Sequence, residues 1–141
     1  MIKLKINNKD ITVEEGTTIL EAARQNNINI PHFCYMGEIH KPGSCRICMV
    51  EVEGSKNLMA SCVTEAKEGM TVQTNTERVR NVRKINYELI LSDHNKECLS
   101  CWRNQNCELQ ELGSLIQVDD YRYEGARSKD FIDLSSPSIV R

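Results

Sequence analysis

Seven cysteines and their spacing constrain this 141-residue chain more than any other feature. The first four follow the pattern C-x10-C-x2-C-x13-C and are Cys34, Cys45, Cys48 and Cys62. The last three follow a histidine in the pattern H-x3-C-x2-C-x5-C, which gives His94, Cys98, Cys101 and Cys107. Seven thiols and one imidazole make eight potential metal ligands. These eight divide into two sets of four, and His94 completes the set that three cysteines leave one ligand short.

The composition and the N-terminal sequence set the chemical context of these cysteines. The net charge is −2, whereas a nucleic-acid-binding domain is usually basic, so we expect no nucleic-acid partner. No apolar run approaches the ~18 residues of a membrane span, and MIKLKINNKD lacks the apolar core of a signal peptide. We therefore expect a cytoplasmic protein with no membrane span. Disulfides are rare in that compartment, so clustered cysteines indicate metal or redox chemistry.

The first 77 residues predict a small α+β sheet domain. Residues 2–6 and the segment ITVEE, 11–15, alternate apolar and polar side chains, which predicts a β-hairpin. Thr18 and Glu21 have the spacing of a helix capping box, so a short helix should begin there. Further strands are predicted in three later segments: CRICMVEVEG (45–54), residues 58–63 and MTVQTN (70–75).

The following segment predicts helices on either side of the second cysteine set. Apolar residues from Val79 to Ile90 recur at helical spacing, which predicts a helix over residues 77–91. A second, short helix is expected over CELQELGSLI, with three leucine and isoleucine side chains facing inward: Leu109, Leu112 and Ile116. The first helix carries a basic run that is either a partner-docking surface or an ordinary solvated face: Arg78, Arg80, Arg83 and Lys84.

The spacing alone leaves two kinds of metal site open. Four cysteines, or three cysteines and a histidine, can hold a structural zinc ion, which would make the chain a non-redox adaptor. Zinc sites usually contain two close cysteine pairs, whereas each set here contains a single C-x2-C pair. Thiolates also hold iron–sulfur clusters, and the plant-type [2Fe–2S] pattern places three cysteines on a loop and one far downstream. The first set has that general form, although its spacing differs from the plant type.

The two motifs together resemble a known family. CYMGEIHKPGSCRICMVEVEG with ASC, and HNKECLSC with NC, are similar to the N-terminal region shared by the large iron–sulfur subunit of respiratory complex I and by multi-cluster [FeFe]-hydrogenases and their NAD(P)-linked relatives. The resemblance implies a β-grasp [2Fe–2S] ferredoxin domain over residues 1–77. It implies a small helical [4Fe–4S] domain over 78–117, followed by a C-terminal tail over 118–141.

The resemblance also implies the ligands and the function. Cys34, Cys45, Cys48 and Cys62 would hold the [2Fe–2S] cluster. His94, Cys98, Cys101 and Cys107 would hold the [4Fe–4S] cluster. We expect an electron relay that works with a flavin-containing NAD(P)H-oxidising subunit or a hydrogenase catalytic domain.

No catalytic residues are expected in this chain. Relatives usually continue into further cysteine-rich repeats and a catalytic domain, whereas the sequence ends at SPSIVR and contains no G-x-G-x-x-G loop for a nucleotide. We therefore expect either a short electron-carrier subunit or a piece of a larger oxidoreductase.

Two side chains beside the ligands each have two possible roles, and His94 has a predicted effect on its cluster. Arg46 lies between two ligands, where it either stabilises the reduced cluster or is simply solvated. Trp102 follows Cys101 and either shields a cluster from water or packs structurally. A neutral histidine ligand makes the site less negative than a fourth thiolate would, so His94 should raise the potential of its cluster.

Overall fold

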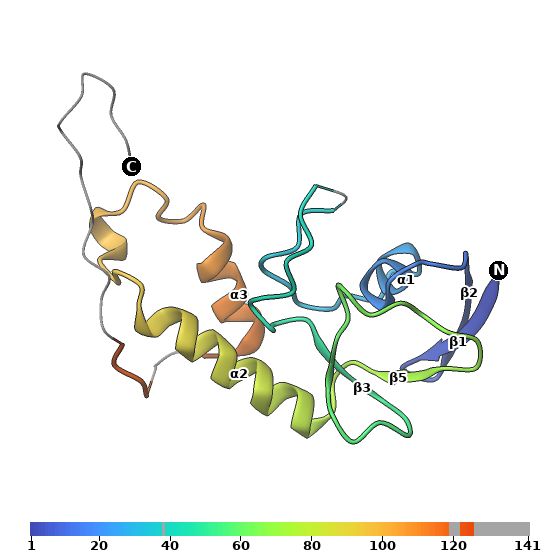
Figure 1. The fold of residues 1–141 in the computed structure, drawn as a ribbon. Helices are drawn as coiled ribbons and strands as arrows, with labels where there is room; N and C mark the ends of the chain where they lie inside the picture. Colours follow the sequence, from blue (N-terminus) through green and yellow to red (C-terminus); the bar gives the residue numbers. More distant parts are fainter. Residues whose placement is uncertain (38, 119–121, 126–141) are drawn as a thin grey trace, which may run out of the picture.

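The computed structural model describes residues 1–37, 39–118 and 122–125. A mixed β-sheet with one helix forms one end of the molecule, and two longer helices form the other (Figure 1). The α+β class and the ferredoxin-like first domain are confirmed. Most of the C-terminal tail expected over 118–141 lies outside the described residues.

Five strands form the sheet. They are β1 (Ile2–Ile6), β2 (Lys9–Val13), β3 (Met49–Val52), β4 (Met59–Ala60) and β5 (Thr71–Gln73). Their order is β2-β1-β5-β3-β4, with β1 parallel to β5 and the other neighbours antiparallel. The predicted hairpin is therefore confirmed, although its second strand spans Lys9–Val13 rather than residues 11–15. The parallel pairing of β1 with β5 brings the two ends of the domain together, since these strands are more than sixty positions apart in sequence.

Three predicted strands are shorter than expected. The segment 70–75 forms a strand only over Thr71–Gln73, and the other two are interrupted next to predicted ligands. The segment 45–54 forms a strand only from Met49, because Arg46 has a positive φ of 56° and residues 45–48 form a loop. The segment 58–63 pairs only at Met59 and Ala60. Ser61 then turns the chain, since both its backbone N–H and its hydroxyl donate to the carbonyl of Cys48, at 3.1 and 2.8 Å. In both cases the departure from the strand occurs at a predicted ligand.

Helix α1 (Ile19–Gln25) covers the sheet. Thr18 caps it as predicted, because its side chain accepts a hydrogen bond from the N–H of Glu21. The carboxylate of Glu21 accepts from the hydroxyl of Tyr35. Helix α1 buries Ile19, Leu20, Ala22 and Ala23 in the first hydrophobic core, which contains the apolar faces of the strands.

Helix α2 (Glu77–Ser92) links the sheet to the second half of the chain. Thr76 caps this helix. Helix α2 contacts β3 and also contacts α3 (Glu108–Ile116). A 3₁₀ turn, η1 (Cys98–Ser100), lies between the two helices. The second core contains side chains from α2, α3 and the first half of the chain: Ile47, Tyr87, Leu109, Leu112 and Val118.

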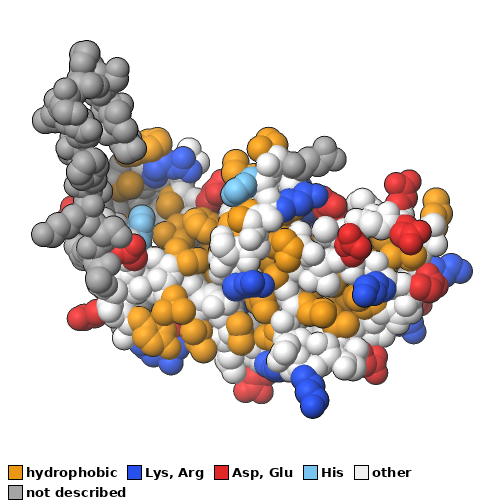
Figure 2. All heavy atoms as spheres, viewed as in Figure 1, with side chains coloured by type: hydrophobic (Ala, Val, Ile, Leu, Met, Phe, Trp, Pro, Cys, Tyr) orange, Lys and Arg blue, Asp and Glu red, His pale blue; other side chains and the backbone are white. Residues whose placement is uncertain are grey.

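The buried face of α2 differs from the simple apolar pattern. The helix buries Arg83 and Glu88 as well as Val79 and Tyr87, whereas Ile85 and Leu89 are 37% and 50% exposed. Figure 2 shows hydrophobic side chains gathered over this helix, with acidic and basic side chains interspersed over the sheet. Arg83 and Glu88 of α2 can be buried because each has hydrogen-bond partners, which a hydropathy pattern does not reveal. No helix in the described part of the chain is both long and apolar enough to cross a membrane.

Candidate metal centres

The first set of cysteines comes together at one end of the sheet. Cys34 and Cys45 lie on the long loop between α1 and β3, Cys48 ends that loop, and Cys62 lies in the turn after β4. Cys48 and Cys62 are 2% and 1% exposed, while Cys34 and Cys45 are partly exposed. The site is therefore half inside the protein and half at its surface.

The thiols of Cys34, Cys45 and Cys62 have shifted pKa values, and neighbouring thiols contribute to each shift. Burial raises the pKa of Cys62 to about 12, and the charges of the other three thiols act in the same direction. Burial also raises the pKa of Cys45. At Cys34, burial acts to raise the pKa, but hydrogen bonds from Cys45 and Ser44 outweigh it and lower the pKa. Four thiols crowded in this way favour a shared positively charged partner such as iron.

The loop that carries Cys45 depends on a glycine. Gly43 has a positive φ of 61°, a conformation that other residues rarely adopt. A Cβ atom there would lie 3.1 Å from a methyl group of Val63, the residue after Cys62. Gly43 therefore allows the loop to pack closely against the turn that carries Cys62, the predicted fourth ligand.

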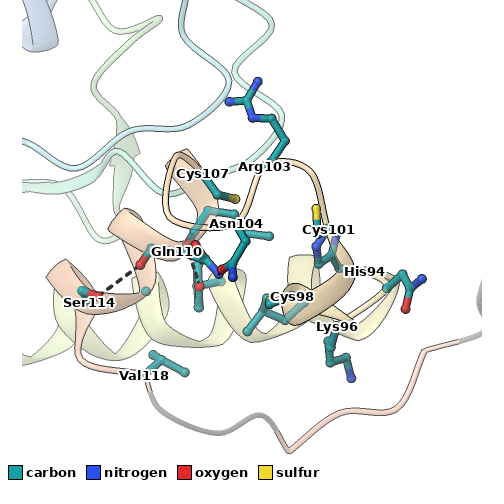
Figure 3. Close-up of a pocket in the computed structure, with 15 residues that line it drawn as sticks. His94, Lys96, Cys98, Cys101, Arg103, Asn104, Cys107, Gln110, Ser114 and Val118 are labelled. Carbon is teal, nitrogen blue, oxygen red and sulfur yellow. Dashed lines mark hydrogen bonds between the residues drawn. The ribbon is translucent and has the colours of Figure 1, made fainter.

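The second set surrounds a cavity of about 500 Å³, shown in Figure 3. His94, Cys98, Cys101 and Cys107 all line it, and each lies at or just beyond a helix end. The N–H groups of His94 and Cys101 donate to the carbonyls of Leu91 and Cys98, at 3.1 Å in both cases. Cys107 is the N-cap of α3, where the helix dipole favours a negatively charged ligand.

Tyr87 also lines this cavity. Its hydroxyl donates to the carbonyl of Leu109 at 2.8 Å. Burial raises the pKa of Tyr87, and the charges of Cys107 and Cys98 add to the effect. Tyr87 therefore lies close to two of the predicted ligands, Cys98 and Cys107. The apolar pattern of the helix does not indicate this position.

The donors fit iron–sulfur clusters. In the described residues, no three histidine, cysteine or acidic side chains converge as ligands of one metal ion. Cysteine thiolates hold iron–sulfur clusters, and histidine replaces cysteine in some of them, so both donor sets have suitable chemistry. Nothing in the described residues favours the zinc alternative.

The side chains whose roles were open are exposed. Arg46 is exposed, although its carbonyl accepts from the side chain of Asn86 at 2.8 Å. Trp102 is 87% exposed and Leu99 is 98% exposed, so Trp102 does not shield the cavity. Within the basic run, Arg83 is buried and so does not belong to a solvated face.

Comparison with known proteins identifies the class. Residues 1–77 match the 2Fe-2S iron-sulfur cluster binding domain, and residues 83–122 match the NADH-ubiquinone oxidoreductase-G iron-sulfur binding region. These matches, with the fold and the two donor sets, define an iron–sulfur protein that carries a [2Fe–2S] and a [4Fe–4S] cluster. The chain belongs to the family of 2Fe-2S iron–sulfur cluster binding domains found in hydrogenase and NADH dehydrogenase subunits.

Three relatives show where such chains occur. An NADP-reducing hydrogenase subunit from Solidesulfovibrio fructosivorans is 41% identical over all of this chain and 25% of its own length. A subunit of an NADH-quinone oxidoreductase from Rhizobium meliloti is 39% identical over 79% of this chain and 13% of its own length. An NAD+-reducing [NiFe]-hydrogenase crystal structure matches with a TM-score of 0.86 and 30% identity, over 96% of this chain and 57% of that one. The chain thus spans a quarter or less of the length of the hydrogenase and NADH-quinone oxidoreductase subunits that it matches.

Proposed function

We propose that this chain relays single electrons between two clusters, each held by one of the two donor sets. Cys34, Cys45, Cys48 and Cys62 hold the [2Fe–2S] cluster. His94, Cys98, Cys101 and Cys107 hold the [4Fe–4S] cluster. When bound, each cluster supplies one-electron chemistry. The chain divides into domains over residues 1–77 and 78–117.

One observation carries the relay. Cys45 from the first set and Cys107 from the second pack against the same hydrophobic core. Ile47, two residues beyond Cys45, is fully buried in that core beside Tyr87. The side chains between the two donor sets are therefore closely packed, which excludes water and fixes their separation.

The kinds of protein that contain this region indicate the redox partners of the chain. Relatives with this region are named as subunits of an NADP-reducing hydrogenase and of NADH-quinone oxidoreductases, and they are several times longer than the matched part. We infer that a flavin-containing NAD(P)H-oxidising subunit, or a hydrogenase catalytic domain, exchanges electrons with this chain. Anaerobic reduction of the chain by NADH through such a flavoprotein, and its absence without the flavoprotein, would support this pairing.

A reductive titration tests the relay itself. We expect the anaerobically purified chain to take up about two electrons from dithionite, one for each cluster, with loss of visible absorbance and two EPR signals. Cys98→Ser should remove one signal and leave the other. A colourless protein that accepts no electrons would refute the proposed function.

A further inference from the structure

Arg83 is a buried cation beside the ligand loop of the first site. It lies on α2 and is 5% exposed. Its guanidinium donates to three backbone carbonyls, those of Ile47 at 2.9 Å, Met49 at 3.1 Å and Thr74 at 3.2 Å. Two of these residues flank Cys48, so Arg83 holds the end of the loop that presents this ligand.

The partners of Arg83 satisfy its hydrogen bonds and leave its charge unbalanced. Within residues 1–37, 39–118 and 122–125, no carboxylate forms an ion pair with it. A buried charge without an opposite charge is costly. Burial lowers the pKa of Arg83, and the charge of Cys48 opposes that effect. The hydrogen bonds to the carbonyls on either side of Cys48 place Arg83 next to the first metal site, where the charge of Cys48 acts on it.

We propose that Arg83 is the buried counter-charge of the [2Fe–2S] cluster and favours its reduced state. The inference rests on the ligand assignment given above. Four thiolates give the oxidised site a net charge of about −2, and one added electron makes it more negative by one unit. A fixed cation attracts the more negative state more strongly, so Arg83 raises the potential at which this site accepts an electron.

Burial separates Arg83 from the other cations nearby. Arg46 lies between Cys45 and Cys48 in sequence, but its side chain is exposed to water and salt. Lys84 follows Arg83 directly and is also exposed. Removing either of these charges should therefore affect the site much less than removing Arg83.

The test is an EPR-monitored redox titration of the full chain carrying both clusters. At the wild-type midpoint, Arg83→Gln should lower the ratio of reduced to oxidised [2Fe–2S] cluster about tenfold, which is a shift of about 59 mV for a one-electron couple. Lys84→Gln and Arg46→Gln should change this ratio less than about twofold. The [4Fe–4S] signal in the same sample serves as an internal reference and should keep its midpoint.

Arg83→Lys separates charge from hydrogen bonding. Lysine keeps the charge and loses the planar fork that reaches three carbonyls. At the wild-type midpoint, the ratio of reduced to oxidised [2Fe–2S] cluster in Arg83→Lys should stay within about threefold of the wild-type ratio. A ratio that differs tenfold or more would overturn the proposal. If Arg83→Gln fails to retain the cluster, Arg83→Lys still tests the proposal, because a tenfold fall in the ratio with the charge in place would overturn it.

Failure of this inference is distinguishable from failure of the relay. If wild-type protein holds no clusters, the proposed function fails and the inference fails with it. If wild-type protein holds both clusters and Arg83→Gln leaves the [2Fe–2S] midpoint unchanged, the relay stands and Arg83 has only a structural role.

Discussion

At the residue scale, Tyr35 ties the loop that carries Cys34 to helix α1. Its hydroxyl donates to the carboxylate of Glu21, which also accepts from Lys41 at 3.3 Å. The hydrogen bond from Tyr35 and the charge of Lys41 lower the pKa of Glu21. Burial and the same hydrogen bond raise the pKa of Tyr35 to about 12. The pair is therefore most stable when Glu21 is ionised and Tyr35 is protonated.

This pair predicts a defined pH dependence of stability. The contribution of Glu21 is present above its ordinary pKa of 4.5 and is lost as the pH falls. The contribution of Tyr35 is present below its ordinary pKa of 10.0 and is lost as the pH rises towards 12. We expect Glu21→Gln to lower the free energy of unfolding by about 1 kcal/mol near neutral pH. The loss should shrink below about pH 4 and above about pH 11.

Urea unfolding at several pH values measures this difference. Glu15→Gln is the matched control, since Glu15 is exposed and should show little effect at any pH. A loss of stability in Glu21→Gln that is constant from acid to alkaline pH would contradict the assigned role of the carboxylate.

His94 allows a second prediction at the same scale. A neutral imidazole leaves the site one negative charge short of four thiolates, so His94→Cys should lower the midpoint of the [4Fe–4S] cluster. His40→Cys makes the same substitution at an exposed histidine outside both sets and should leave that midpoint in place. An unchanged or higher midpoint in His94→Cys, with the cluster present, would count against His94 as a ligand.

At the element scale, the packing of α2 on α3 depends on a glycine within a helix. A Cβ atom at Gly113 would overlap the hydroxyl of Tyr87 and lie 3.0 Å from its Cζ atom. Tyr87 in turn is held by the carbonyl of Leu109. The close approach of the two helices therefore fixes the position of Tyr87, which lines the cavity.

Gly113→Ala separates packing from helix propensity. Propensity alone predicts that alanine stabilises α3 by about 1 kcal/mol. The contact with Tyr87 predicts a loss of about 1–3 kcal/mol, because the helices must move apart. Ser114→Ala is the control at the adjacent exposed position and should be neutral or slightly stabilising. A thermal melt in which Gly113→Ala is more stable than wild type would contradict the packing described here.

The elements also show what the sequence predicts well and what it does not. The helix over residues 19–25 was predicted from its cap at Thr18, and the helix over 77–92 from the helical spacing of its apolar residues. Both are local signals. The strand predicted over 45–54 was partly wrong, because residues 45–48 follow the geometry of the ligand loop. The burial of Arg83 depends on the carbonyls of Ile47 and Met49, which are 36 and 34 positions away in sequence, so no local pattern could reveal it.

At the scale of the whole molecule, the two halves share structure at the place where electrons would pass. Ile47 lies between two ligands of the first set and is buried in the second core. Helix α2 contacts the first site through Arg83 and the second through Tyr87. The division of seven cysteines and His94 into two sets of four could be predicted from their spacing. The shared packing between the two sets could not, because it depends on contacts between distant parts of the chain.

The central claim is that eight residues hold two different clusters. Iron, acid-labile sulfide and zinc content of anaerobically purified protein tests it most directly, with Cys62→Ser and Cys98→Ser measured beside the wild type. We predict about six iron atoms per wild-type chain, about four in Cys62→Ser and about two in Cys98→Ser, with sulfide in proportion and little zinc. About two zinc ions per chain and no sulfide would contradict the account and leave a structural zinc protein.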